Sequence, residues 1–115
     1  MTLNELKTIL EEAREAAQLE SQAVYNRYGT DHVGCCGFAW VNIYEHNGVK
    51  LKGNTRMGRL LKQAGVRQDY TRAFQVWGGE WYHGQSIDIK EAGARAYADV
   101  LKRHGFTAYP GSRLD

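Results

Sequence analysis

The sequence predicts an α+β fold in which a ferredoxin-like split β-α-β sandwich follows a long N-terminal helix. Three observations lead to this class: heptad-like apolar spacing over residues 3–27, period-two alternation after Cys36, and helical and strand patterns that alternate from there on. The expected order after the first helix is strand, helix, strand, strand, helix, strand, which gives an antiparallel sheet with two helices on one face. We expect one domain over residues 1–115, with the helix at 1–28 and an α+β body at 35–115.

Composition favours a folded domain and sets few limits on its partners. The chain has 115 residues, 43% of them hydrophobic, with 13 Gly and one Pro, which is typical of a globular protein. The net charge of +2 is too balanced to indicate nucleic-acid binding, so any basic surface must come from arrangement. No segment approaches the roughly 18 apolar residues of a membrane span. We therefore expect a cytoplasmic protein without a membrane partner.

The first element is expected to be a helix over residues 3–27. Thr2 and Glu5 form the S/T-x-x-E capping box, and Tyr28–Asp31 ends the helix. Its apolar stripe can pack on the body of the fold or against a second copy of the chain, which would produce a homo-oligomer. The stripe consists of Leu3, Leu6, Leu10, Ala13, Ala17 and Val24.

A strand is expected over residues 36–45, where apolar side chains alternate between two sides. Ala39, Val41 and Ile43 share one side, and Phe38, Trp40, Asn42 and Tyr44 share the other. Because both sides are largely apolar, we expect a central strand with helices on one face and an aromatic surface on the other. His46–Gly48 forms a turn into a second short strand at 49–52.

A basic loop then leads into a short helix, expected at 55–64, with Asn54 as N-cap and Gly65 at the C′ position. Lys50–Lys62 is 13 residues long and contains five cations and no acid. Free N–H groups at the helix start and these basic side chains suit a phosphate or carboxylate. The loop is neither a P-loop nor a G-x-G-x-x-G motif, and a solvated basic face is the structural alternative.

The C-terminal half is expected to contain a hairpin, a helix and a last strand. Gly78-Gly79 joins strands at 71–77 and 80–87, Asp88 and Glu91 cap a helix that ends at Gly105, and a strand follows at 106–109. Residues 110–115 are expected to be a polar tail. Gly58 and Gly93 fall inside helices, where each costs about 1 kcal/mol relative to Ala. Close packing accounts for both, and an approaching ligand is the alternative for Gly58.

The sequence predicts one binding site built around the basic loop. In this site Trp40 or Trp77 stacks on a base, Ser112 and Arg113 close over an anion, and the loop holds phosphate through Lys52, Asn54, Thr55, Arg56 and Arg59. The aromatic side chains can also form a platform for bases, although no RNP1 motif is present. The candidate platform consists of Phe38, Trp40, Tyr44, Trp77, Trp81 and Tyr82.

We expect no catalytic residues, metal or cofactor, and the balance favours a protein that is not an enzyme. Cys35 and Cys36 are adjacent and form no zinc or CxxC framework. A thiolate activated by His32, His46 or His83 is the enzymatic alternative. The histidines lack metal-site spacing, and turns or helix caps account for the carboxylates.

Four segments resemble parts of small uncharacterised accessory proteins of tailed bacteriophages, over about residues 35–115. They are Cys36–Ile43, Lys52–Lys62, Gln85–Ala94 and Gly111–Asp115. The resemblance implies a protein that acts in the infected bacterial cytoplasm and disables a host component. We therefore expect a non-catalytic protein that captures an anionic small ligand, foremost a nucleotide such as a signal of antiviral defence. The alternatives are an inhibitor of a host protein or a structural phage component, and a nucleic-acid-binding protein.

Overall fold

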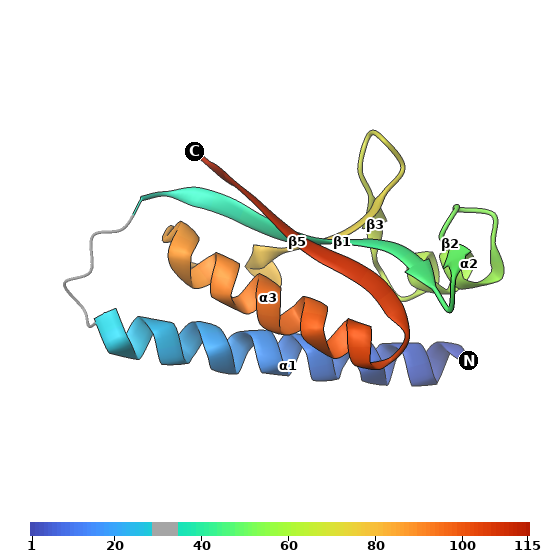
Figure 1. Ribbon diagram of the computed structural model, residues 1–115, viewed down its shortest axis with the longest axis horizontal. Helices are drawn as coiled ribbons and strands as arrows, with labels where there is room; N and C mark the ends of the chain where they lie inside the picture. Colours follow the sequence, from blue (N-terminus) through green and yellow to red (C-terminus); the bar gives the residue numbers. More distant parts are fainter. Residues whose placement is uncertain (29–34) are drawn as a thin grey trace.

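The computed structural model describes residues 1–28 and 35–115 and confirms the α+β class (Figure 1). Three α-helices, one 3₁₀ helix and an antiparallel sheet of five strands are formed by these residues. In chain order the elements are α1 (Leu3–Tyr28), β1 (Gly37–His46), β2 (Val49–Lys50), α2 (Arg56–Gln63), β3 (Arg67–Gln68), β4 (Phe74–Trp77), η1 (Gly78–Glu80), α3 (Ile87–Arg103) and β5 (Phe106–Leu114).

Strand β1 is the centre of the sheet, as its two-sided apolar pattern predicted. β5 pairs antiparallel with it from Gly37 to His46, with a register shift between Ile43 and Glu45. β5 occupies one edge of β1. The other edge pairs with β4 at residues 40–43 and with β2 at residues 45–46. β3 adds two residues beside β4. Every strand pair is antiparallel.

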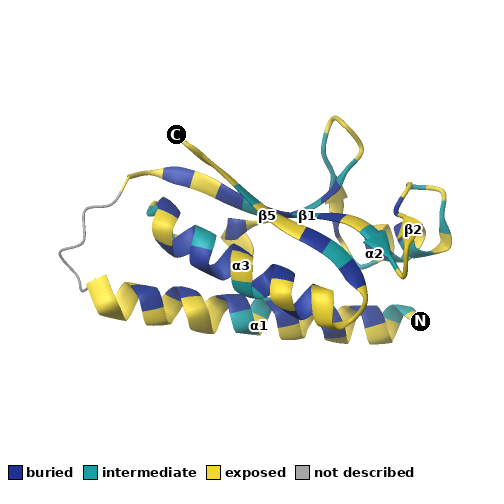
Figure 2. Cartoon of the chain, viewed as in Figure 1, coloured by how far each residue is buried: buried dark blue, intermediate teal, exposed yellow. Residues whose placement is uncertain are grey.

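The helical layer covers one face of this sheet. Ala39, Val41 and Ile43 are buried against α3, which packs on β1 and β5, and α1 runs alongside α3 (Figure 1). Figure 2 shows the buried residues of both helices facing this core. The sequence predicted that 55–64 and 88–105 would cover the sheet, but α2 lies at its end, beside the β1–β2 hairpin. The N-terminal helix α1 takes the place expected for α2.

Helix α1 packs on the body of the fold, the first of the two arrangements expected for it. Thr2 Oγ1 accepts from Glu5 N at 3.2 Å and donates to Glu5 Oε1 at 3.2 Å, which caps the helix. Ser21 continues the buried stripe and donates to Ile89 O at 3.0 Å. The stripe is therefore not available to a second copy of the chain. Its buried members are Leu6, Ile9, Ala13, Ala17, Ser21 and Val24. Of the expected helix end at Tyr28–Asp31, Tyr28 is the last residue of α1 and residues 29–31 lie outside the described residues.

Two turns are confirmed and one helix cap is corrected. Asn47 (φ 52°) and Gly48 (φ 79°) form the β1–β2 turn, and Gly65 (φ 92°) follows α2 as expected. The N-cap of α2 is Thr55, not Asn54, because Thr55 has extended backbone angles and its Oγ1 accepts from Gly58 N at 3.0 Å.

The predicted hairpin at Gly78-Gly79 and the strand at 80–87 are wrong. Gly78 begins η1, and its carbonyl accepts from Trp81 N at 3.1 Å and Tyr82 N at 3.0 Å. A Cβ at Gly78 would lie 3.0 Å from Ala39 O, so close packing on β1, not a hairpin, accounts for this glycine. The hairpin partner of β4 is β3. The ferredoxin-like arrangement of the strands is therefore not confirmed.

The predicted polar tail is also wrong, because residues 110–114 belong to β5. Leu114 lies opposite Gly37, so the full length of β1 provides pairing groups for the chain end. Within the described residues, each helix is too short or too polar to cross a lipid bilayer.

Candidate functional site

The face of the sheet opposite the helices is aromatic and exposed. Because Ala39, Val41 and Ile43 point to the core, alternate residues of β1 point outward, and the strand register brings residues of β4 and β5 to the same side. We call this side the outer face; it consists of Phe38, Trp40, Asn42, Tyr44, Gln75, Trp77, Tyr109, Gly111 and Arg113. The exposed fractions are 37% for Phe38, 45% for Tyr44, 42% for Trp77 and 54% for Tyr109. The aromatic surface expected on β1 is therefore present.

Three aromatic rings form one end of the outer face, which we call the tryptophan end. The Trp40 and Trp77 ring centroids are 5.0 Å apart, and the Phe38 ring lies 6.2 Å from Trp77 in an edge-on arrangement. Gly111 of β5 lies under Trp40, where a Cβ would approach Nε1 to 2.5 Å. The glycine therefore leaves room for the indole ring on the sheet.

Two cations lie beside the tryptophan end. The Arg113 guanidinium carbon and Lys90 Nζ are each 5.5 Å from the Phe38 ring centroid. Lys90 is nine-tenths buried and donates one hydrogen bond, to Gly37 O at 3.0 Å, although an ammonium has three donors. Within the described residues neither cation forms an ion pair. The end therefore combines flat rings with two cations that form no ion pair within the described residues.

A polar network crosses the middle of the outer face. Gln75 Nε2 donates to Asn42 Oδ1 at 2.7 Å and to Asp69 Oδ2 at 3.3 Å. Asp69 Oδ1 accepts from Thr71 Oγ1 at 2.6 Å, Thr71 N at 2.8 Å and Ala73 N at 3.0 Å. The hydrogen bond from the Thr71 hydroxyl, and to a lesser extent those from the backbone N–H groups, hold the pKa of Asp69 below its ordinary value. The network fixes the β3–β4 turn against the sheet.

The other end of the outer face is a basic groove of about 740 Å³. Tyr44 and Tyr109, whose ring centroids are 6.0 Å apart, line it together with Lys50, Lys52 and Arg72. Glu45 is the one carboxylate in the lining, and among the described residues none of the three cations is in an ion pair. The rest of the lining is Ile43, Leu51, Thr71, Ala73 and Thr107. The groove therefore suits an anion that carries a ring.

Arg72 reaches this groove from a strained backbone position. Its φ is 69°, in the left-handed region that disfavours residues with a side chain. Arg72 N donates to Asp69 O at 2.9 Å, and Arg72 O accepts from Gln68 Nε2 at 2.9 Å. These bonds hold the arginine in place at the groove.

The structure divides the predicted site residues among three places. Lys52 lines the groove, whereas Trp40, Trp77 and Arg113 belong to the tryptophan end. Thr55 and Arg56 border a separate cavity of about 330 Å³ at the start of α2, where Arg56 Nη2 donates to Met1 O at 3.2 Å.

Arg59 is also held away from the aromatic rings. Its Nη1 donates to Asn54 O at 2.8 Å, within the loop itself. The expected single site, with a base on Trp40 and phosphate on the α2 start, is therefore not assembled within one chain.

Within one chain, Ser112 and Arg113 do not lie over the basic loop. Arg113 pairs with Phe38 whereas Lys50 pairs with Glu45. The separation between these two positions of β1 corresponds to roughly 23 Å of extended strand. Ser112 donates instead to Glu91 Oε1 of α3 at 2.7 Å.

Sequence reasoning missed three residues of the outer face and its surroundings, namely Tyr109, Lys90 and Arg72. Tyr109 carried the period-two signal, since it is three residues into the last predicted strand. Lys90 gave no local signal because it lies within a helix pattern, and Arg72 was assigned to the predicted strand 71–77, whereas the structure places it in the β3–β4 turn. Of the predicted platform, Trp81 is buried, 5.4 Å from the Tyr97 ring.

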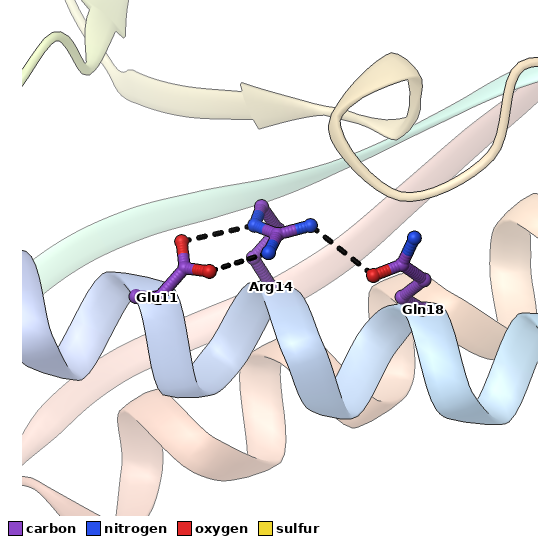
Figure 3. A network of polar contacts seen from close by, with 3 residues as sticks. All are labelled: Glu11, Arg14 and Gln18. Atoms are coloured by element: carbon purple, nitrogen blue, oxygen red, sulfur yellow. Dashed lines mark hydrogen bonds and ion pairs between the residues drawn. The ribbon is translucent and has the colours of Figure 1, made fainter.

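A third hollow, of about 630 Å³, lies between α1 and β4. Arg14 binds both carboxylate oxygens of Glu11 and donates to Gln18 Oε1 at 3.2 Å along its rim (Figure 3). The lining contains Lys7, Arg14 and Arg67 but also Glu11 and Glu80. Because two carboxylates accompany the three cations here, and only one accompanies the three cations of the groove, this cavity suits an anion less well than the groove does.

Of the groups considered for thiol chemistry, Cys36 directly precedes the first residue of β1 and His46 is the last residue of that strand. Cys35 and Cys36 are exposed and unpaired, and burial lowers the pKa of His46 below its ordinary value. His32 lies outside the described residues. In residues 1–28 and 35–115, no three His, Cys, Asp or Glu side chains gather as a metal ion requires.

Comparisons of the chain with protein-family models, with curated proteins and with solved structures give no match.

Proposed function

We propose that the protein is a non-catalytic binding protein that captures an anionic ligand with an aromatic base, a nucleotide, on the outer face. One observation carries the proposal: five aromatic side chains of three strands stay on the solvent side of the sheet, beside cations that form no ion pair with the described residues. Soluble proteins rarely expose a large contiguous group of aromatic rings unless that surface binds a ligand or a partner.

The base is held at the tryptophan end. Stacking of a base on an aromatic side chain contributes roughly 1–3 kcal/mol, and Trp40 and Trp77 form a paired surface for it. The Asn42 and Gln75 amides lie next along the strands, so a hydrogen-bonding edge of the base has polar partners nearby.

The phosphate is held by Arg113. Its guanidinium lies against Phe38, next to the two tryptophans, and a guanidinium binds phosphate through paired hydrogen bonds. The nearby Lys90 adds positive charge in a poorly solvated position.

The biological setting follows from the resemblance to phage accessory proteins. Binding without chemistry is sufficient to lower the free concentration of a nucleotide signal in an infected cell. In this setting the protein sequesters a signal of host antiviral defence.

Isothermal titration calorimetry with adenosine, guanosine, cytidine and uridine monophosphates tests the proposal. We expect at least one to bind, and Trp40→Ala and Arg113→Ala each to weaken it about tenfold or more. Arg56→Ala with Arg59→Ala is the matched control, because both arginines lie at the α2 loop. Unchanged binding by Trp40→Ala, or binding lost only in the α2 variant, would place the ligand elsewhere.

The exposed aromatic rings also favour a second function, capture of a host protein by the same face. Complexes formed through apolar contacts survive high salt, whereas phosphate contacts weaken. Co-purification of a host protein at high salt, lost in Trp77→Ala, would support this function or that of a structural phage component. A homo-oligomer would have to use a surface other than the buried stripe of α1.

A further inference from the structure

We infer that the preferred ligand extends beyond one nucleotide and is a single-stranded oligonucleotide that runs along β1 from the tryptophan end into the basic groove. The inference rests on the proposed function, since it takes base stacking at the tryptophan end as given. It assigns to the groove the task of binding the next phosphates and the next base.

The spacing of the aromatic rings supports a ligand of this length. Trp40 and Tyr44 both point outward from β1 and are four residues apart, which corresponds to about 13 Å. One base covers only one of these positions, whereas a strand of two or three linked nucleotides reaches both. Tyr44 and Tyr109 then form a second stacking surface, 54% exposed at Tyr109.

The charge of the groove supports a ligand with repeated phosphates. Lys50, Lys52 and Arg72 line it against one carboxylate, Glu45, and among the described residues the three cations form no ion pair. Along the strand between the two ends, the acid of the network, Asp69, is already hydrogen-bonded through both oxygens. A polyanion therefore meets positive charge at both ends; between them lie the Asn42 and Gln75 amides and one carboxylate, Asp69, whose two oxygens are occupied by hydrogen bonds.

The backbone of Arg72 gives independent support. A residue with a side chain at φ 69° carries a conformational cost that glycine would avoid. Such strain is concentrated at functional positions, where the surrounding structure maintains it. Two hydrogen bonds maintain this backbone conformation, one from Gln68 Nε2 to Arg72 O and one from Arg72 N to Asp69 O. The conformation places the arginine at the groove. A phosphate-binding role accounts for an arginine at a position that favours glycine.

Competition fluorescence anisotropy tests the inference. A fluorescein-labelled pentathymidylate is displaced by unlabelled 5′-phosphorylated thymidylates of one, two, three and five units. We expect affinity to rise about tenfold or more from one unit to three and to change little from three to five, because the outer face is then filled.

The double variant Lys52→Ala/Arg72→Gly isolates the groove. Glycine suits the positive φ at position 72, so this variant removes two charges without adding strain. We expect this double variant to lose the rise in affinity with the number of nucleotides, while it binds thymidine monophosphate as tightly as the unmodified protein does. The slope of log affinity against log salt for the trinucleotide should become shallower by about 1.4, because the variant no longer neutralises two of the phosphates. The control variant Lys7→Ala/Arg95→Ala also removes one lysine and one arginine, but from the helical layer. It should retain the rise in affinity with the number of nucleotides.

The outcomes separate this inference from the proposed function. If the monophosphate binds through Trp40 and lengthening brings no gain, the inference is overturned and the function stands. If the pentathymidylate binds but Lys52→Ala/Arg72→Gly keeps the full gain, the groove is not the second subsite. If neither the monophosphates nor the oligonucleotides bind, both fail.

Discussion

Replacing Gly58 by alanine tests the packing of the basic loop on α2. In an ordinary helix interior this change stabilises by about 1 kcal/mol. At Gly58, however, the new Cβ would lie 3.0 Å from the Lys52 carbonyl carbon, closer still to its oxygen, and 2.9 Å from Thr55 Oγ1. The alanine therefore fits only if the loop moves away from the helix.

The cost of that movement follows from the bonds it breaks. The Lys52 carbonyl accepts from Thr55 N at 3.1 Å and from Thr55 Oγ1 at 2.7 Å, and each bond contributes about 1 kcal/mol. Thr55 also caps the helix, which contributes about 1 kcal/mol more. Set against the helix-propensity gain, the loss of unfolding free energy is about 1–2 kcal/mol. For 115 residues this lowers Tm by roughly 4–8 °C.

Urea denaturation followed by circular dichroism measures this free energy. Gly79→Ala is the control, because no heavy atom lies within 4 Å of the Cβ it adds, and its effect should stay within about 0.5 kcal/mol. If Gly58→Ala leaves the protein as stable or makes it more stable, the loop does not pack on α2 as described. The alternative role of Gly58, room for a ligand, would then regain support.

Further predictions concern the α2 cap and a buried phenol. Thr55→Ala should lower the unfolding free energy by about 1 kcal/mol in urea, and Asn54→Ala by a few tenths at most; the reverse order would restore Asn54 as the cap. Burial, with smaller contributions from Glu80 and Glu11, raises the pKa of Tyr97 above its ordinary value. The folded state thus retains the Tyr97 proton longer than the unfolded chain does, so stability falls as pH rises above about 10. Tyr97→Phe should flatten the decline of unfolding free energy above that pH, and an identical decline would contradict the assignment.

The long helix and the two-sided central strand follow from the sequence because their signals repeat over many residues. The α1 stripe has four turns or more of consistent spacing, and β1 alternates between Ala39 and Tyr44 without interruption. Such a pattern identifies an element and its buried side before any partner is known. The aromatic outer face was predictable for the same reason.

The second half of the chain shows where local signals are insufficient. Gly78-Gly79 suits a hairpin turn and equally suits a close approach to Ala39, and the choice depends on where β1 lies. The chain end appeared to be a polar tail because Pro110–Asp115 has no strand pattern. It becomes part of β5 because β1 leaves a long edge to be paired.

The residues of the candidate site also fall into two groups, those that the sequence indicated and those that only the fold brought together. By itself, the sequence determined which residues carry suitable chemistry: Trp40 and Trp77 for stacking, and Lys52 and Arg113 for an anion. Only the tertiary structure decided that Arg113 lies beside Phe38, roughly 23 Å along β1 from the basic loop, and that Arg72 and Tyr109 join Lys52 in a groove. The physical reason is that residue type and spacing set local geometry, whereas strand register sets which distant residues meet. In this protein the register results from the pairing of β4 and β5 along β1, so it cannot be predicted from the sequence of any one segment.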